Sequence, residues 1–122
     1  MTEIQGPPYC TLVSDPPWPE YGGGKIRRGA NAHYPLMSVE EIKALGPMVK
    51  AWRSEEGCHL YLWVTNNYLP AALEVMKAWG FEYRTKIDWG KVTAEGVPAI
   101  GIGQYFRGAS ESCLFGVYGH LP

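Results

Sequence analysis

Four consecutive residues have the types and spacing to act on an amino group: Asp15, Pro16, Pro17 and Trp18. The Asp15 carboxylate and the Pro16 carbonyl can each accept a hydrogen bond, and together they could hold both N–H bonds of an exocyclic amino group on a nucleobase. Proline suits this role because it offers no competing N–H and its fixed φ holds the carbonyl in one direction. The motif therefore predicts that an amino nitrogen is presented for reaction.

Such a nitrogen is a weak nucleophile because its lone pair is delocalised into the ring. Two acceptors that hold the amino group away from planarity present the lone pair to a methyl donor held in line, and positioning then matters more than acid–base catalysis. Trp18 would give the base a flat surface, and stacking of this kind is worth roughly 1–3 kcal/mol per base. Taken alone, the motif could equally be a turn that ends a strand, in which the Asp side chain accepts a hydrogen bond from the nearby main chain.

The residues before the motif predict a strand that delivers Asp15 to a sheet edge. Tyr9–Ser14 is a short β-favouring apolar run, and the two prolines that follow cannot continue a ladder. Asp15 is therefore expected at the carboxyl end of a buried strand, where open α/β sheets bind ligands. Pro19–Pro35 has no hydrophobic periodicity and predicts a loop.

That loop carries three cations, Lys25, Arg27 and Arg28, which form a small positive patch among glycines. The patch could meet substrate phosphates, although a merely solvated loop explains it equally well. The formal net charge of the chain is -1, so any contact with nucleic acid has to rely on such a local patch.

The remaining pattern alternates helices and strands. Ser38 and Glu41 form a capping box that starts a helix, which breaks at Gly46–Pro47, and Met48–Trp52 is expected to add a short second turn. His59–Thr65 is nearly continuous in apolar residues and predicts a central strand covered on both faces. A helix from Leu69 that ends at Gly80 and strands at 81–89 and 112–118 complete the list. We therefore predict an α/β fold with a mostly parallel sheet and flanking helices.

Trp63 and Asn66 stand at the end of the presumed central strand, on the side where ligands are expected. Core packing is the favoured interpretation for Trp63. Asn66 is a candidate substrate contact, or only a helix cap.

At this point the sequence resembles a known family. The Asp-Pro-Pro-Trp motif is followed in order by six further blocks, and together they are similar to MT-A70 methyltransferases over nearly all of the chain from Tyr9 to Gly119. The blocks are Tyr34–Ile42, Leu60–Asn66, Trp79–Phe81, Trp89–Lys91, Gly103–Arg107 and Glu111–Gly116.

The resemblance implies a Rossmann-like methyltransferase that transfers a methyl group from S-adenosyl-L-methionine to adenine N6 in DNA or RNA. It makes Asp15, Pro16, Pro17 and Trp18 the catalytic motif, with Asp15 and Pro17 also contacting the cofactor. Tyr34 falls where the family has an aromatic residue in the loop that closes on the base, and Lys91 matches the lysine of a Trp-x-Lys block. An exposed loop tyrosine and a solvated charge are the ordinary alternatives for these two.

Family members place much of the cofactor site after the segment seen here. The resemblance therefore predicts a single partial domain, with a sheet face left uncovered and a possible homo- or hetero-oligomer that completes the fold. A non-catalytic nucleic-acid-binding or scaffold subunit is the main alternative function. A second alternative is methylation of cytosine N4, whose enzymes usually have Ser in place of the Asp.

The composition and the residue patterns of the chain indicate its class, its cellular location and its partners. The chain has 46% hydrophobic and 19% charged residues, as ordinary globular domains do. We expect no membrane partner, because no apolar run approaches the roughly 20 residues that span a bilayer, and without a signal peptide we expect a cytoplasmic protein. The cysteines lack CxxC spacing and the histidines lack ligand spacing, so no metal is expected.

Overall fold

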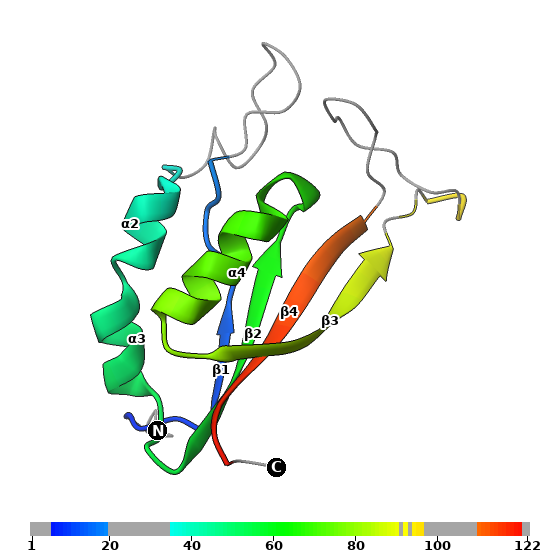
Figure 1. Ribbon diagram of the computed structural model, residues 1–122. Coiled ribbons are helices and arrows are strands. Elements are labelled where there is room, and N and C mark those ends of the chain that lie inside the picture. The colour runs from blue at the N-terminus through cyan, green and yellow to red at the C-terminus, as the bar shows by residue number, and fades with distance from the viewer. Residues whose placement is uncertain (1–5, 20–34, 91, 93, 97–109, 121–122) are drawn as a thin grey trace, which may run out of the picture.

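The structure is a computed structural model that describes residues 6–19, 35–90, 92, 94–96 and 110–120. Within these residues, helices and strands alternate along the chain as far as β3 (Figure 1). In chain order the elements are β1 (Thr11–Ser14), α2 (Val39–Lys43), α3 (Gly46–Trp52), β2 (Gly57–Val64), the 3-10 turn η1 (Asn66–Tyr68), α4 (Leu69–Ala78), β3 (Glu82–Gly90) and β4 (Ser110–Gly119). The predicted α/β class is confirmed.

The sheet has the strand order β1-β2-β4-β3, and three of its four strands run in the same direction, while β4 runs in the opposite one. β1 and β2 pair in parallel, whereas β4 pairs antiparallel with both β2 and β3. Helices connect β1 to β2 and β2 to β3, so these strands run in one direction, as crossover connections require. β4 then inserts between β2 and β3 in the opposite direction, which strand–helix alternation could not reveal.

The local signals for the helices are confirmed. The amide N–H of Glu41 donates to Ser38 Oγ at 3.1 Å, and the amide N–H of Ser38 donates to Glu41 Oε1 at 2.9 Å, which completes the capping box at the start of α2. Prolines occupy the first turns of α3 and α4, where no amide donor is needed. Gly80 follows α4 with φ +86°, a conformation that L side chains rarely adopt.

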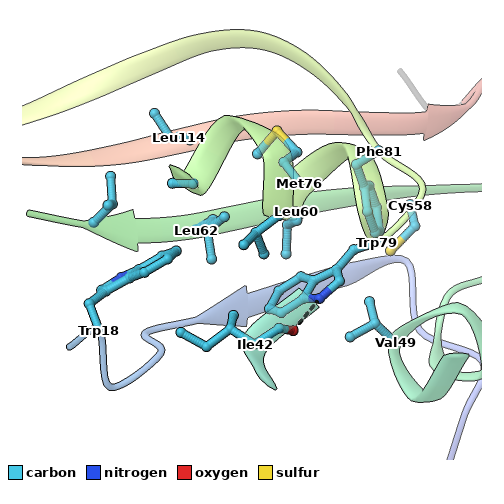
Figure 2. Close-up of a cluster of buried hydrophobic side chains, with 13 residues drawn as sticks. Trp18, Ile42, Val49, Cys58, Leu60, Leu62, Met76, Trp79, Phe81 and Leu114 are labelled. Atoms are coloured by element: carbon cyan, nitrogen blue, oxygen red, sulfur yellow. Dashed lines mark hydrogen bonds between the residues drawn. The ribbon is translucent and has the colours of Figure 1, made fainter. Parts of the chain in front are cut away.

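The core lies between one face of the sheet and the helices (Figure 2). Ile42 of α2 and Trp79 after α4 meet there, and the indole N–H of Trp79 donates to the Ile42 carbonyl at 2.9 Å. Gly116 of β4 lets α4 approach closely, since a Cβ at this position would lie 2.6 Å from Met76 Sδ. Other buried members are Val49, Cys58, Leu60, Leu62, Val64, Ala72, Val75, Phe81 and Leu114.

The opposite face of the sheet is only partly covered within the described residues. His59, Tyr61 and Trp63 of β2 alternate with the core residues and are only half-buried, so the expectation that this strand is covered on both faces is wrong for the described part of the chain. Ile87 and Trp89 of β3 are 54% and 61% exposed on the same face. We call this side, away from the described helices, the open face. No described helix is long and apolar enough to cross a membrane.

Candidate active site

The Asp-Pro-Pro-Trp motif lies at the carboxyl edge of the parallel strand pair. β1 ends at Ser14, which is paired with Leu62, and Asp15 follows directly. Its position at the end of a strand is as predicted, and the residue is exposed while Pro16 behind it is buried. Asp15 is therefore an exposed residue that directly precedes a buried one.

Main-chain hydrogen bonds fix the turn that follows. The amide N–H of Trp18 donates to the Pro16 carbonyl at 2.8 Å, and the amide N–H of Met37 donates to the Pro17 carbonyl at 2.9 Å. The first bond closes a tight turn around Pro17, and the second joins this turn to the residue before the α2 cap. The direction of the Pro16 carbonyl is thus tied to the position of Trp18.

Trp18 does not form the flat exposed surface predicted for a stacked base. Its side chain is 4% exposed and belongs to the core, where Figure 2 shows it beside Ile42 and Leu62. The indole N–H donates to the Trp63 carbonyl at 2.9 Å, and the ring stacks on Tyr68 with 6.1 Å between centroids and 17° between planes. A buried indole requires such a partner for its N–H, so the structure assigns Trp18 to anchoring the motif.

The electrostatics of the site centre on two carboxylates. Although Asp15 is exposed as a residue, nearby protein atoms partly desolvate its carboxyl group and raise its pKa, and the negative charge of Glu111 raises it further. Glu111 lies near the start of β4, paired with Trp89 of β3. Two carboxylates that repel each other fit a positively charged ligand, such as a cationic methyl donor. Among the described residues, no group of three His, Cys, Asp or Glu side chains could hold a metal ion.

Asn66 lies where the sequence placed it, at the carboxyl end of β2. It is exposed and opens η1, and its main-chain carbonyl accepts from the Leu69 amide. Thr65 holds the N-cap position, so the helix-cap interpretation of Asn66 is wrong. The other predicted substrate contacts, Tyr34, Lys91, Lys25, Arg27 and Arg28, lie outside the described residues.

Sequence reasoning missed three residues around the motif. Tyr68 contacts Trp18, Glu111 acts on Asp15, and Trp89 lies edge-on to Trp63 with 6.2 Å between ring centroids and 79° between planes. Trp63 itself was expected in the core but is half-buried on the open face. These relationships depend on strand register, which the sequence does not show, although Trp89 and Glu111 each open one of the blocks that resemble the family.

Similarity to known proteins covers most of the chain. The MT-A70 family model matches residues 9–121. The chain is 28% identical over 115 residues to the N6-methyladenosine RNA methyltransferase MTA1 of Cryphonectria parasitica, covering 90% of this chain and 34% of that protein. It is 25% identical over 134 residues to the type II methyltransferase M.MunI of a Mycoplasma species, covering 93% of this chain and 53% of that protein. The chain thus spans from about a third to about half of the length of these relatives, and it belongs to the MT-A70 family.

Proposed function

We propose that this chain carries the acceptor side of an S-adenosyl-L-methionine-dependent methyltransferase that modifies the N6 amino group of adenine in DNA or RNA. The observation that carries the proposal is the placement of the exposed residue Asp15 at the carboxyl end of β1, next to a Pro16 carbonyl that the Trp18 amide holds in a tight turn. The relatives' names support it, since one is an N6-methyladenosine RNA methyltransferase and the other a type II methyltransferase.

In this proposal the two acceptors orient the amino group. Asp15 accepts one N–H of the adenine amino group, and the Pro16 carbonyl accepts the other. The Pro16 oxygen already receives the Trp18 amide at 2.8 Å, but a carbonyl oxygen has two lone pairs, so one remains for the substrate. The nitrogen lone pair then points out of the base plane toward the donor.

The methyl donor supplies an electrophilic methyl group attached to a positively charged sulfur. As the new N–C bond forms, the C–S bond breaks and its electron pair goes to sulfur, while the methylated nitrogen loses a proton to water. Asp15 and Glu111 give the site a negative charge that attracts such a cationic donor. Asp15 and Pro17 are our candidates for direct contact with it.

The surface for the base is offered by the open face instead of by Trp18. Trp89 is 61% exposed and is supported edge-on by Trp63, whose strand ends beside β1. An exposed indole supported in this way suits base stacking. Further candidate contacts are Asn66 at the end of β2 and, outside the described residues, Tyr34, Lys91 and the cationic patch of Lys25, Arg27 and Arg28.

A second candidate is a non-catalytic nucleic-acid-binding or scaffold subunit of a methyltransferase complex. The open face favours it, because Val13, Ile87 and Trp89 are 69%, 54% and 61% exposed there, and apolar side chains grouped on a sheet face favour association with another protein. Such a subunit would not need an intact acceptor motif.

Calorimetric titration with S-adenosyl-L-methionine, followed by transfer of a labelled methyl group to oligonucleotides, separates these candidates. The acceptors are matched DNA and RNA strands. In one set adenine is the only base with an amino group, and in the other set cytosine is the only such base. The proposal expects cofactor binding and label in the adenine strands, and the DNA and RNA arms decide which acceptor is used. Label only in the cytosine strands would indicate methylation of cytosine N4. Absence of both cofactor binding and label would favour the non-catalytic subunit.

A further inference from the structure

Tyr68 makes an unusual pair of contacts with the motif. It is the last residue of η1 and lies directly before α4. Its ring stacks on Trp18, and its hydroxyl donates to the Pro19 carbonyl at 2.5 Å across 49 residues of sequence. One side chain therefore restrains both the last residue of the motif and the residue that follows it.

The segment that carries Tyr68 is joined to both β2 and the core. Its own amide N–H donates to the Thr65 carbonyl at 3.1 Å, which fixes it to the end of β2. The helix that it precedes is anchored in the core by Ala72, Val75 and Met76, all with 0% exposure. Tyr68 thus connects the end of β2 and the start of α4 to the motif.

The restraint reaches the proposed acceptor groups through the main chain. Trp18 is bonded through its amide to the Pro16 carbonyl at 2.8 Å and through its indole to the Trp63 carbonyl at 2.9 Å. If Trp18 shifts, the turn around Pro17 opens and the Pro16 carbonyl changes direction. Because catalysis by positioning is sensitive to small displacements, such a change would lower the rate of the chemical step.

From these contacts we infer that Tyr68 is a positioning residue for methyl transfer, one that acts through Trp18 and Pro19 to aim the Pro16 carbonyl and the Asp15 carboxylate. The inference rests on the proposed function. Tyr68 is half-buried and its hydroxyl is engaged by Pro19, so its influence on the substrate is indirect. An ordinary core residue in this place would affect the folded fraction but not the rate of transfer per folded molecule.

The experiment compares Tyr68→Phe, which removes only the hydroxyl, with Tyr68→Leu, which also removes the stacked ring. Tyr118→Phe is the matched control, since Tyr118 is also half-buried but pairs with Cys58 at the far end of β2, where its ring faces Arg53. Two readouts are taken on the full chain: hydrogen exchange of the Trp18 main-chain amide by NMR, and kcat and KM for methyl transfer to an adenine oligonucleotide.

For Tyr68→Phe we expect exchange of the Trp18 amide to rise, and kcat to fall, by about fivefold to tenfold, the effect of losing one neutral hydrogen bond, with KM unchanged. Tyr68→Leu should exceed these changes, and Tyr118→Phe should show neither. Unchanged exchange in Tyr68→Phe, or faster exchange with an unchanged kcat, overturns the inference. If the wild-type chain transfers no methyl group, the proposed function fails instead, and the exchange rates alone still decide whether Tyr68 restrains the motif.

Discussion

The indole N–H of Trp18 donates a 2.9 Å hydrogen bond to the main-chain carbonyl of Trp63, 45 residues further along the chain. The bond joins the segment after β1 to the end of β2, so the candidate active site and the hydrophobic core share a residue. Asp15 and the Pro16 carbonyl are consequently presented from a turn whose far end is buried. Stability and function should therefore respond differently to changes at neighbouring motif positions.

Trp18→Phe tests the anchoring role. The smaller ring leaves the Trp63 carbonyl without its indole donor and leaves a small space in the core, so the free energy of unfolding should fall by about 1–3 kcal/mol. Trp52→Phe is the control, because Trp52 is 39% exposed and its replacement should change stability by no more than about 0.5 kcal/mol. Urea denaturation measures both. Equal stability of the two variants would argue against a structural role for Trp18.

The pH dependence of transfer tests the carboxylate pair. Desolvation and the charge of Glu111 raise the pKa of Asp15, so on acidification the acceptor carboxylate is protonated at a higher pH than an ordinary aspartate. Glu111→Gln removes the second cause and should move the acidic limb of the kcat/KM profile to lower pH. Glu55→Gln is the control, because Glu55 is exposed and lies before β2, and this variant should leave the pH profile unchanged. If the acidic limb of the profile does not move in Glu111→Gln, Glu111 does not belong to the candidate active site.

Trp89→Ala tests the stacking surface. If the exposed indole supports a base, its loss should raise KM for the oligonucleotide by roughly 5-fold to 150-fold, the range that corresponds to about 1–3 kcal/mol of stacking. Tyr83→Ala is the control on the same strand, because Tyr83 is 41% exposed and pairs with the core-facing Gly116. A KM that rises equally in both variants would indicate a general effect on β3, and no rise in Trp89→Ala would contradict the stacking role.

Local signals in the sequence predicted the parts of the fold that depend on near neighbours. The capping box of Ser38 and Glu41 marks the start of α2, and the two prolines after Asp15 mark the end of β1. Gly80 ends α4 because a positive φ is needed there. In each case the physical cause lies within a few residues, so the prediction needed no knowledge of the tertiary structure.

Non-local relationships could not be predicted in the same way. The insertion of β4 between β2 and β3 depends on strand pairing over long sequence separations, and it made the sheet mixed. Burial of Trp18 depends on Trp63 and Tyr68, since an indole at a strand end can equally face a ligand or the core. The motif and its position at the end of β1 could therefore be predicted from the sequence. The burial of Trp18 beside an exposed Asp15 could be seen only in the structure.

The most direct test is the identification of the methylated product. The wild-type chain and Asp15→Ala are incubated with an adenine-containing oligonucleotide and S-adenosyl-L-methionine, and the digested nucleosides are analysed by mass spectrometry. We predict N6-methylated adenine nucleoside with the wild-type chain and none with Asp15→Ala, whose free energy of unfolding should stay within about 0.5 kcal/mol of the wild type because Asp15 lies at the surface. N6-methylated product from folded Asp15→Ala at the wild-type rate would contradict the account.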